Sequence, residues 1–390
     1  MTTALEIHGT CDSRFSSVKD TFARNFDDFG EVGASVAVMI DGEPVVDLWA
    51  GHADAARTRP WERDTIANVY SCTKGMVATC IARLIGEGRL DVDEPVATYW
   101  PEFAQAGKGD VSVRLLLSHQ AGLPAIADVL PPGAIFNWDV VTDALAKQEP
   151  WWEPGTKHGY HAITFGYLAG ELVRRVTGTS VGTYFRDEIA EPLGIDFHIG
   201  LPEEHDPRVA DIIPAPMPDT AGDNALAAAL QDPTSMTFKA FLLSPDMMLP
   251  NLVNTRRWRA AEVPAANGHG NARALAAVYA ALARGGELDG VRVATSQAIE
   301  RASQEEASGD DAVVLVMPMR VGLGFQLSIE DWQLGPNPRS FGHGGMGGSI
   351  GFADPDARVG FGYVMNKMIL PEDRVDPRWP RLVGALYDSI

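Results

Sequence analysis

The chain has 390 residues, of which 45% are apolar and 22% charged, as in a globular protein of one large domain or two closely packed ones. Its 52 acidic residues outnumber 32 basic ones, and the net charge of −20 argues against a polyphosphate, a nucleic acid or an anionic membrane surface as partner. No apolar run reaches the length that spans a membrane.

The three cysteines, Cys11, Cys72 and Cys80, are too few for a disulfide framework. Cys72 and Cys80 fall on one predicted helix, too far apart to form a disulfide. The N-terminus has neither the basic nor the apolar region of a signal peptide. These features predict a reducing compartment, and we expect a cytoplasmic protein.

Hydrophobic periodicity predicts strands near both ends of the chain and helices between them. The predicted helices cover residues 13–29, 71–87, 113–118, 163–176, 181–189, 271–284 and 378–388. The predicted strands cover residues 34–40, 44–49, 312–317, 322–328, 349–353 and 359–365. An Asp-Gly turn at residues 41–42 joins the first two strands into a hairpin. Long loops are predicted around residues 130–132 and over 202–234.

This order of elements predicts an α+β fold. One antiparallel sheet is built from both ends of the chain and is flanked by the terminal helices. Residues 1–100 and 270–390 would form this α/β domain, and residues 101–269 an inserted helical domain. We expect a cleft where the two domains meet.

A Ser-x-x-Lys motif, Ser71-Cys72-Thr73-Lys74, begins the apolar helix 71–87. Residues three apart share a helix face, so the Lys74 amine can reach the Ser71 hydroxyl. Burial lowers the pKa of a lysine and makes it a proton acceptor for a serine nucleophile. A second match, Ser16 to Lys19, lies on the polar side of an amphipathic helix, and we interpret it as a chance occurrence.

Three further segments follow in a fixed order: Gly88-Arg-Leu-Asp-Val-Asp-Glu-Pro-Val96, Leu116-Leu-Ser-His-Gln-Ala-Gly-Leu-Pro124 and Pro154-Gly-Thr-Lys-His-Gly-Tyr160. Together with Ser71-Cys-Thr-Lys74, this series resembles the β-lactamase-related serine hydrolases and is most similar to family VIII carboxylesterases. The resemblance covers nearly the whole chain. It implies a β-lactamase/penicillin-binding-protein-like fold, an antiparallel sheet flanked by helices with an inserted all-helical domain, and chemistry without a cofactor or a metal.

The resemblance also implies roles for single residues. Tyr160, in Tyr160-His161-Ala162, matches the tyrosine of a family Tyr-x-Asn motif and would be the base that activates Ser71, with a packed core tyrosine as the alternative. Ala162 departs from the motif, because an amide that would contact a β-lactam side chain is missing.

The family's Lys-Thr-Gly segment, on an edge strand of the sheet, is replaced here by His343-Gly344-Gly345. The three residues are predicted to bind substrate, and the loss of the lysine disfavours substrates with a carboxylate. The backbone N–H groups of Ser71 and Met346 would form the oxyanion hole. For His343, a substrate contact and a packed histidine stay equally open.

Other residues allow two interpretations. Trp152, with Trp151 beside it, either lines an acyl pocket or packs between the domains. His119 is expected to support the loop beneath the site. His158 and His161 lie three apart, but no third metal ligand is evident.

Two glycine-rich matches are interpreted as chance. Gly347 to Gly351 reads Gly-Gly-Ser-Ile-Gly, as in the nucleophile elbow of α/β-hydrolases, but no histidine follows Ser349. The overlapping segment 342–347 matches a dinucleotide-binding pattern, but no helix is predicted after it.

The sequence therefore predicts a serine carboxylesterase that cleaves short-chain esters through an acyl-enzyme on Ser71, with a small-molecule ester as partner. The alternatives are an amidase or acyltransferase of the same fold, a weak β-lactamase, or a ligand-binding sensor without turnover. No oligomeric state is predicted.

Overall fold

The computed structural model describes residues 5–215, 225–315, 317–369 and 376–390, and its core is a nine-stranded antiparallel sheet. The strands follow the order β1-β3-β2-β14-β13-β12-β11-β10-β9. In chain order they are β1 (Ile7–Cys11), β2 (Gly33–Ile40), β3 (Glu43–Gly51), β9 (Ala307–Asp310), β10 (Pro318–Val321), β11 (Gln326–Leu327), β12 (Phe341–Gly344), β13 (Ile350–Asp354) and β14 (Val359–Met365).

The two ends of the chain meet in the middle of this sheet. Strand β2 pairs with β14 over its whole length, with Val36 opposite Tyr363. The β2–β3 hairpin turns at Asp41 and Gly42, which both have positive φ, as a two-residue hairpin of the mirror-image type requires. The prediction of one antiparallel sheet built from both ends is confirmed.

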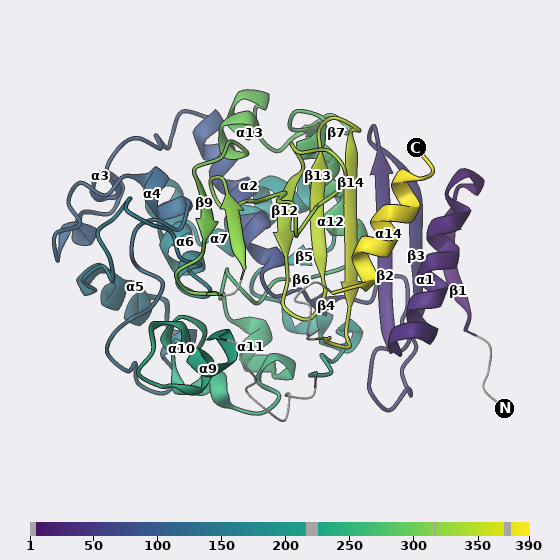
Figure 1. The fold of residues 1–390 in the computed structure, drawn as a ribbon, viewed down its shortest axis with the longest axis horizontal. Coiled ribbons are helices and arrows are strands. Elements are labelled where there is room, and N and C mark those ends of the chain that lie inside the picture. The colour runs from purple at the N-terminus through teal and green to yellow at the C-terminus, as the bar shows by residue number, and fades with distance from the viewer. Residues whose placement is uncertain (1–4, 216–224, 316, 370–375) are drawn as a thin grey trace.

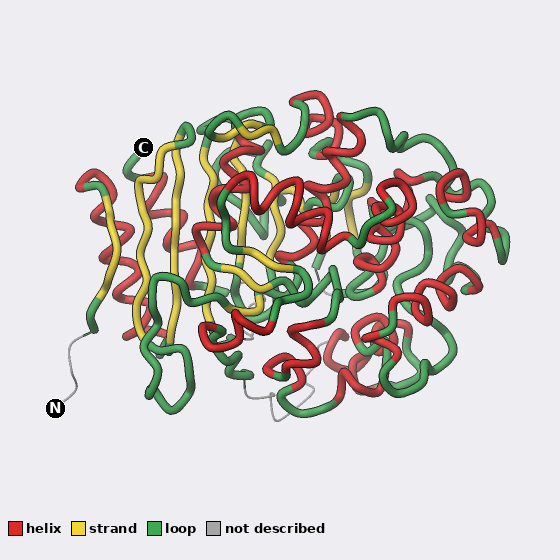
Figure 2. Tube along the Cα trace, turned by 180° about the vertical axis from the view of Figure 1, so that it is seen from behind, coloured by secondary structure: helices red, strands yellow, loops and turns green. Residues whose placement is uncertain are grey.

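Helices cover both faces of the sheet (Figures 1 and 2). On one face, α1 (Ser16–Phe29) and α14 (Arg378–Tyr387) pack against each other and share an apolar core with β2, β3 and β14. Against the other face lie α2 (Cys72–Gly86) and α12 (Ala272–Ala283), together with α13 (Ser296–Ala302). Gly30, the expected end of α1, caps it in the left-handed conformation.

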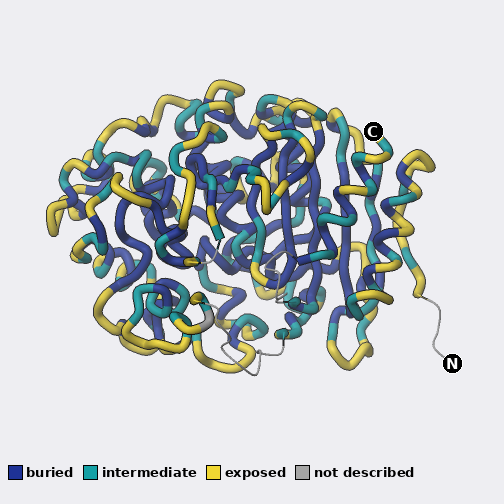
Figure 3. The backbone as a smooth tube through the Cα atoms, in the orientation of Figure 1, coloured by how far each residue is buried: buried dark blue, intermediate teal, exposed yellow. Residues whose placement is uncertain are grey.

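The middle of the chain forms a helical region beside the sheet, on the left in Figure 1. Its helices are α3 (Val96–Tyr99), α4 (Val113–Leu117), α5 (Trp138–Lys147), α6 (Thr164–Thr177), α7 (Val181–Phe185), α8 (Glu191–Leu193), α9 (Ala225–Gln231), α10 (Met236–Phe241) and α11 (Arg256–Ala260). Short strands β4 (Ala67–Asn68), β5 (Phe197–His198) and β6 (His269–Gly270) form a second sheet, and β7 (Glu287–Leu288) pairs with β8 (Val291–Arg292). Buried backbone runs without a break through both regions (Figure 3), and the division at residues 101 and 269 stays a prediction.

Two predicted strands were wrong, and one predicted helix is present but changes its type along its length. Residues 312–315 form a turn and not a strand, because the Asp311 carboxylate accepts the N–H groups of Val313 and Val314; residue 316 of that prediction lies outside the described residues. Of residues 322–328 only Gln326–Leu327 is a strand, since the chain turns at Gly324. The helix expected over 181–189 ends as α7 at Phe185 and continues as a π-helix over Arg186–Ala190.

Strand β12 is not at the sheet edge, because β11, β10 and β9 extend the sheet beyond it. The loop predicted over 202–234 contains a 3-10 helix over Glu203–Arg208 and the start of a helical segment at α9, while residues 216–224 lie outside the described part. The expectation about the N-terminus also concerns residues 1–4, which are not described. In the described part of the chain no helix is long and apolar enough to cross a membrane.

Candidate active site

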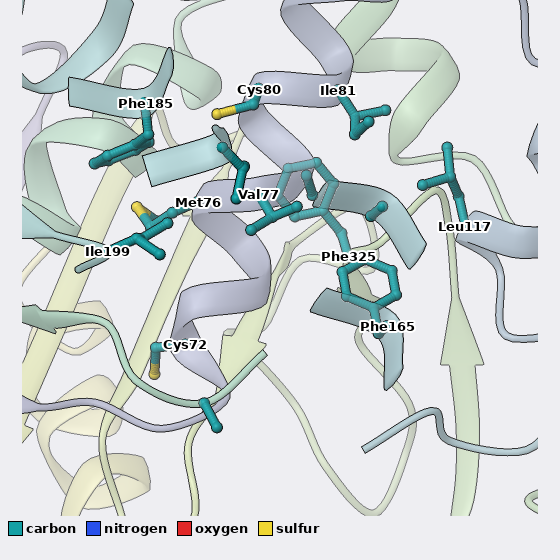
Figure 4. Packing of buried hydrophobic residues seen from close by; sticks show 14 of the residues in the cluster. Cys72, Met76, Val77, Cys80, Ile81, Leu117, Phe165, Phe185, Ile199 and Phe325 are labelled. Carbon is teal, nitrogen blue, oxygen red and sulfur yellow. The ribbon is translucent and has the colours of Figure 1, made fainter. Parts of the chain in front are cut away.

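Ser71 occupies the N-terminal cap of helix α2, which is largely buried. The apolar side chains of this helix pack against apolar neighbours that include Phe165 of α6, Phe185 of α7 and Phe325 (Figure 4). Tyr70, just before Ser71, has a φ of 45°, a left-handed conformation that is unusual for a bulky residue and turns the chain sharply into the helix. Ser71 itself is half-buried, so its hydroxyl stays within reach of solvent.

Lys74, one turn into α2, is fully buried and has three polar neighbours. Its Nζ lies 3.1 Å from Ser71 Oγ, 2.8 Å from the Ala162 carbonyl oxygen and 2.9 Å from the Ala265 carbonyl oxygen. No carboxylate from the described part of the chain pairs with it, and burial lowers the pKa of Lys74 well below its usual range. A neutral amine has two N–H groups and one lone pair. A neutral Lys74 that gives both N–H groups to the two carbonyls turns its lone pair toward Ser71 Oγ.

Tyr160 lies against Lys74, with the amine 4.7 Å from the centroid of its ring. Burial raises the pKa of the Tyr160 hydroxyl, while a hydrogen bond to Ser71 lowers it. The rise shows that Tyr160 rests as a neutral phenol beside Ser71. The arrangement therefore makes Lys74 the better proton acceptor and Tyr160 the better proton donor.

The Tyr160 segment is held by groups from two other parts of the chain. His119 accepts the His161 N–H at Nδ1 (3.2 Å), and its carbonyl accepts the Gly159 N–H (3.1 Å). Asp311, from the turn after β9, accepts the Tyr160 N–H at 3.1 Å. His119 thus lies under the loop as expected, whereas Asp311 escaped sequence analysis, because it was placed next to a predicted strand and carries no motif.

The His343-Gly344-Gly345 segment ends strand β12 directly beside Ser71. Gly345 is required there, because a Cβ atom on it would lie only 2.2 Å from the Val69 carbonyl oxygen. The next residue, Met346, is 48% exposed, and no described residue accepts a hydrogen bond from its backbone N–H. The structure therefore brings Ser71, Lys74, Tyr160 and the end of β12 to one place.

His343 is buried, with its Nδ1 2.7 Å from the Gly344 carbonyl oxygen and its ring centroid 6.1 Å from that of Tyr160. Burial and the nearby Lys74 lower the pKa of His343 to about 3, so the ring is neutral at physiological pH. A neutral ring that bonds a carbonyl through Nδ1 leaves Nε2 as an acceptor, and no described residue donates to it. Trp152 is buried as well, with its ring edge-on to His161.

The serines of two motifs interpreted as chance differ from Ser71 in their surroundings. Ser16 and Lys19 are exposed on α1. Ser349 is buried at the start of β13, and a strand rather than a helix follows it. His161 is held by Leu123 N–H and the Gly159 carbonyl, and no group of metal ligands is found among the described residues.

Comparison with known proteins identifies the family. The model of the β-lactamase family matches residues 22–385. The chain therefore belongs to the β-lactamase family, and the predicted family and fold class are confirmed.

Individual relatives and structures agree with this family. Over 374 residues the chain is 38% identical to the esterase/β-lactamase LipL of Mycobacterium tuberculosis, covering 94% of this chain and 84% of that protein. The crystal structure of a family VIII carboxylesterase is 46% identical and matches with a TM-score of 0.89, over 99% of this chain and 100% of that one. A penicillin-binding protein homologue from Caulobacter crescentus is 44% identical, also with a TM-score of 0.89 over 99% and 100% of the two chains.

Proposed function

We propose that this β-lactamase-family protein is a serine carboxylesterase, which cleaves short-chain carboxylic esters through an acyl-enzyme on Ser71. The observation that carries the proposal is the environment of Lys74. A buried amine, with no carboxylate partner among the described residues, lies within hydrogen-bonding distance of two carbonyl oxygens and of the Ser71 hydroxyl, and burial lowers its pKa. Such a group has little structural use, but it is a base held ready for a serine nucleophile.

In the proposed acylation step, Ser71 Oγ attacks the ester carbonyl carbon while Lys74 takes the hydroxyl proton. The carbonyl oxygen becomes an oxyanion, which is stabilised by the backbone N–H groups of Ser71 and Met346. The free N–H of Met346 and the close approach of Gly345 to the Ser71 segment support this role. The bond between the former carbonyl carbon and the alkoxide oxygen of the ester then breaks, which leaves the acyl group on Ser71.

Tyr160 supplies the proton that the departing alkoxide needs, because its phenol is neutral and touches Ser71. The proton on Lys74 then returns to Tyr160, which restores both groups. Deacylation repeats these steps with water in place of Ser71: Lys74 takes the water's proton, Tyr160 gives its proton to Ser71 Oγ as the acyl bond breaks, and the proton on Lys74 then returns to Tyr160. All protons and bonds in these two steps are accounted for without a cofactor or a metal.

Two substitutions favour neutral esters over β-lactams and peptides. Ala162 offers no amide for a β-lactam side chain, and the neutral His343 offers no cation for a carboxylate. LipL is named as both an esterase and a β-lactamase, so residual β-lactam hydrolysis is the second activity to measure. We place His343, Gly344, Gly345 and Trp152 against the substrate.

We also infer a cytoplasmic location and a division into a sheet domain (residues 1–100 and 270–390) and a helical domain (residues 101–269), with substrate bound in a cleft between them. Three unpaired cysteines support the reducing compartment. The meeting of Ser71 from α2 with Tyr160 from the helical region supports the division. Fractionation of the native host's cells, and limited proteolysis near residues 101 and 269, test the two inferences.

The function is tested by assaying the purified protein on p-nitrophenyl butyrate and on a chromogenic cephalosporin. We expect the butyrate to be cleaved, Ser71→Ala to abolish turnover, and Ser16→Ala and Ser349→Ala to retain it. The cephalosporin should be cleaved slowly or not at all. An active Ser71→Ala protein would refute the proposed nucleophile, and a wild type inactive on all esters would favour an amidase, an acyltransferase or a sensor.

A further inference from the structure

Arg378, the first residue of helix α14, is completely buried, and all five of its N–H donors have acceptors. Nε bonds the Asp376 carboxylate at 2.9 Å, and Nη1 bonds Glu31 Oε1 at 2.8 Å and the Lys367 carbonyl at 2.9 Å. Nη2 bonds Asp376 Oδ2 at 2.5 Å and the Gly347 carbonyl at 2.6 Å. A guanidinium so fully saturated has a fixed position and orientation.

The Gly347 carbonyl belongs to the tight turn that follows β12 and carries Met346. This turn closes through Gly345 N–H to the Ser349 carbonyl (2.7 Å) and Gly348 N–H to the Gly345 carbonyl (3.2 Å). Arg378 lies directly behind it: a Cβ atom on Gly348 would be 2.3 Å from both Arg378 Nη2 and Asp376 Oδ2. The Gly347 carbonyl, one residue after the Met346 N–H, is thus held by Arg378 Nη2 at 2.6 Å and by the Ile369 N–H at 3.2 Å.

Stability alone does not account for this buried charge cluster. Two carboxylates and a guanidinium lose their hydration when they are buried, and apolar replacements of such clusters are often as stable or more so. Helix α14 already has an apolar anchor, since Trp379, Leu382 and Leu386 are buried against α1 and the sheet. What an apolar side chain cannot do is donate a hydrogen bond to the Gly347 carbonyl.

We propose that Arg378 is a positioning residue of the active site: through the Gly347 carbonyl it fixes the turn that aims the Met346 N–H at the oxyanion. This inference rests on the proposed function, in which Met346 is an oxyanion-hole donor. The C-terminal helix would then contribute to catalysis without touching the substrate. A donor displaced by a fraction of an ångström weakens mainly the transition state, where the oxygen carries its charge.

The test compares Arg378→Lys and Arg378→Met with two controls from the same helix. Leu386→Ala removes a buried apolar side chain away from the turn, and Arg381→Met removes an exposed arginine that pairs with Asp28. Each variant is assayed for kcat and KM on p-nitrophenyl butyrate, for melting temperature, and for inhibition by a trifluoromethyl ketone, which forms a tetrahedral adduct with the serine.

We expect kcat to fall about 10- to 100-fold in Arg378→Met and by a smaller factor in Arg378→Lys, with KM changed less than about threefold. The inhibition constant of the ketone should rise by the same factor as kcat/KM falls. Leu386→Ala should melt earlier with kcat unchanged, and Arg381→Met should resemble the wild type. In a third variant, Arg378→Ala, which leaves space for a small cation, added guanidinium should restore part of the kcat.

The proposal is overturned if folded Arg378→Lys keeps kcat and ketone affinity within about twofold of the wild type, or if the Arg378 variants lose melting temperature alone, as Leu386→Ala does. Either result leaves the proposed function intact, since Ser71→Ala tests that separately. Loss of turnover in every Arg378 variant without any change in ketone affinity would also overturn it, because the oxyanion hole would then be undisturbed.

Discussion

At the scale of single residues, the proposed chemistry depends on ionisable side chains whose pKa values are shifted by burial. Burial raises the pKa of Tyr160, so this group rests as a neutral phenol, and burial lowers the pKa of Lys74 well below its usual range, which favours the neutral amine. The neighbouring histidines are neutral as well, since burial lowers the pKa of His161 to about 4 and that of His343 to about 3. Lys74 is therefore the group whose protonation should control activity.

We predict that kcat/KM falls on acidification as Lys74 becomes protonated, and that it holds a plateau up to at least about pH 9, because Tyr160 stays a phenol there. A pH–rate profile on p-nitrophenyl acetate, corrected for spontaneous hydrolysis, measures both limbs. A loss of activity on raising the pH from 7 to 9 with the protein still folded would contradict the assignment.

Replacing Lys74 itself provides a second test at this scale. Lys74→Met removes the base while filling similar space, and we predict a loss of about 10²- to 10⁴-fold in kcat. Lys19→Met, in the exposed Ser-x-x-Lys match on α1, is the matched control and should leave kcat unchanged. Equal effects of the two substitutions would mean that the buried motif is not the catalytic one.

At the scale of elements, the site depends on a turn that reaches across from the sheet. The Asp311 carboxylate accepts the N–H groups of Tyr160, Val313 and Val314, and the Ala312 N–H bonds the His158 carbonyl at 3.1 Å. The turn after β9 thereby clamps the backbone of the Tyr160 segment. The same carboxylate is the reason why residues 312–315 form a turn and not the expected strand.

We predict that Asp311→Ala lowers the free energy of unfolding by about 2–3 kcal/mol, because three buried N–H groups lose their acceptor. It should also lower kcat by about tenfold or more, since Tyr160 loses its anchor. Asp311→Asn keeps an acceptor oxygen and should be milder, while Asp310→Ala, on the exposed neighbour, is the control. Urea unfolding and kcat measured on the same preparations check this, and unchanged values in Asp311→Ala would refute the clamp.

At the scale of the whole molecule, neutral histidines are buried in the interior. Burial lowers the pKa of His161 to about 4, and those of His269 and His343 to about 3. In the unfolded chain each would titrate near 6.5. Between about pH 6.5 and 4 the unfolded state therefore binds more protons than the folded one, so these three groups make the fold less stable as the pH falls.

We predict that each of these histidines contributes a loss of about 2 kcal/mol in unfolding free energy between pH 7 and pH 5. Urea unfolding at pH 7 and at pH 5 measures the summed contribution of the three histidines to the free energy of unfolding. His269→Asn, which lies in β6 away from Ser71 Oγ and Tyr160, should reduce the pH dependence by one histidine's share. A pH dependence identical to the wild type would show that His269 is not held neutral.

The sequence by itself determined the sheet built from both chain ends, helices α1, α2, α6, α12 and α14, and the candidate nucleophile and its lysine. These follow from local periodicity and from motifs in one continuous segment, where spacing along the chain fixes spacing in space. The class of enzyme followed from the order of the motifs and agrees with the family and with the carboxylesterase relatives.

Only the tertiary structure decided which groups surround these residues. The carbonyls of Ala162 and Ala265 meet at Lys74 from segments 88 and 191 residues away, and Asp311 reaches Tyr160 from 151 residues away. Arg378 reaches Gly347 from another element altogether. Burial, which sets the pKa values of Lys74 and Tyr160, is likewise a property of the packed molecule, because it depends on every element that covers the group.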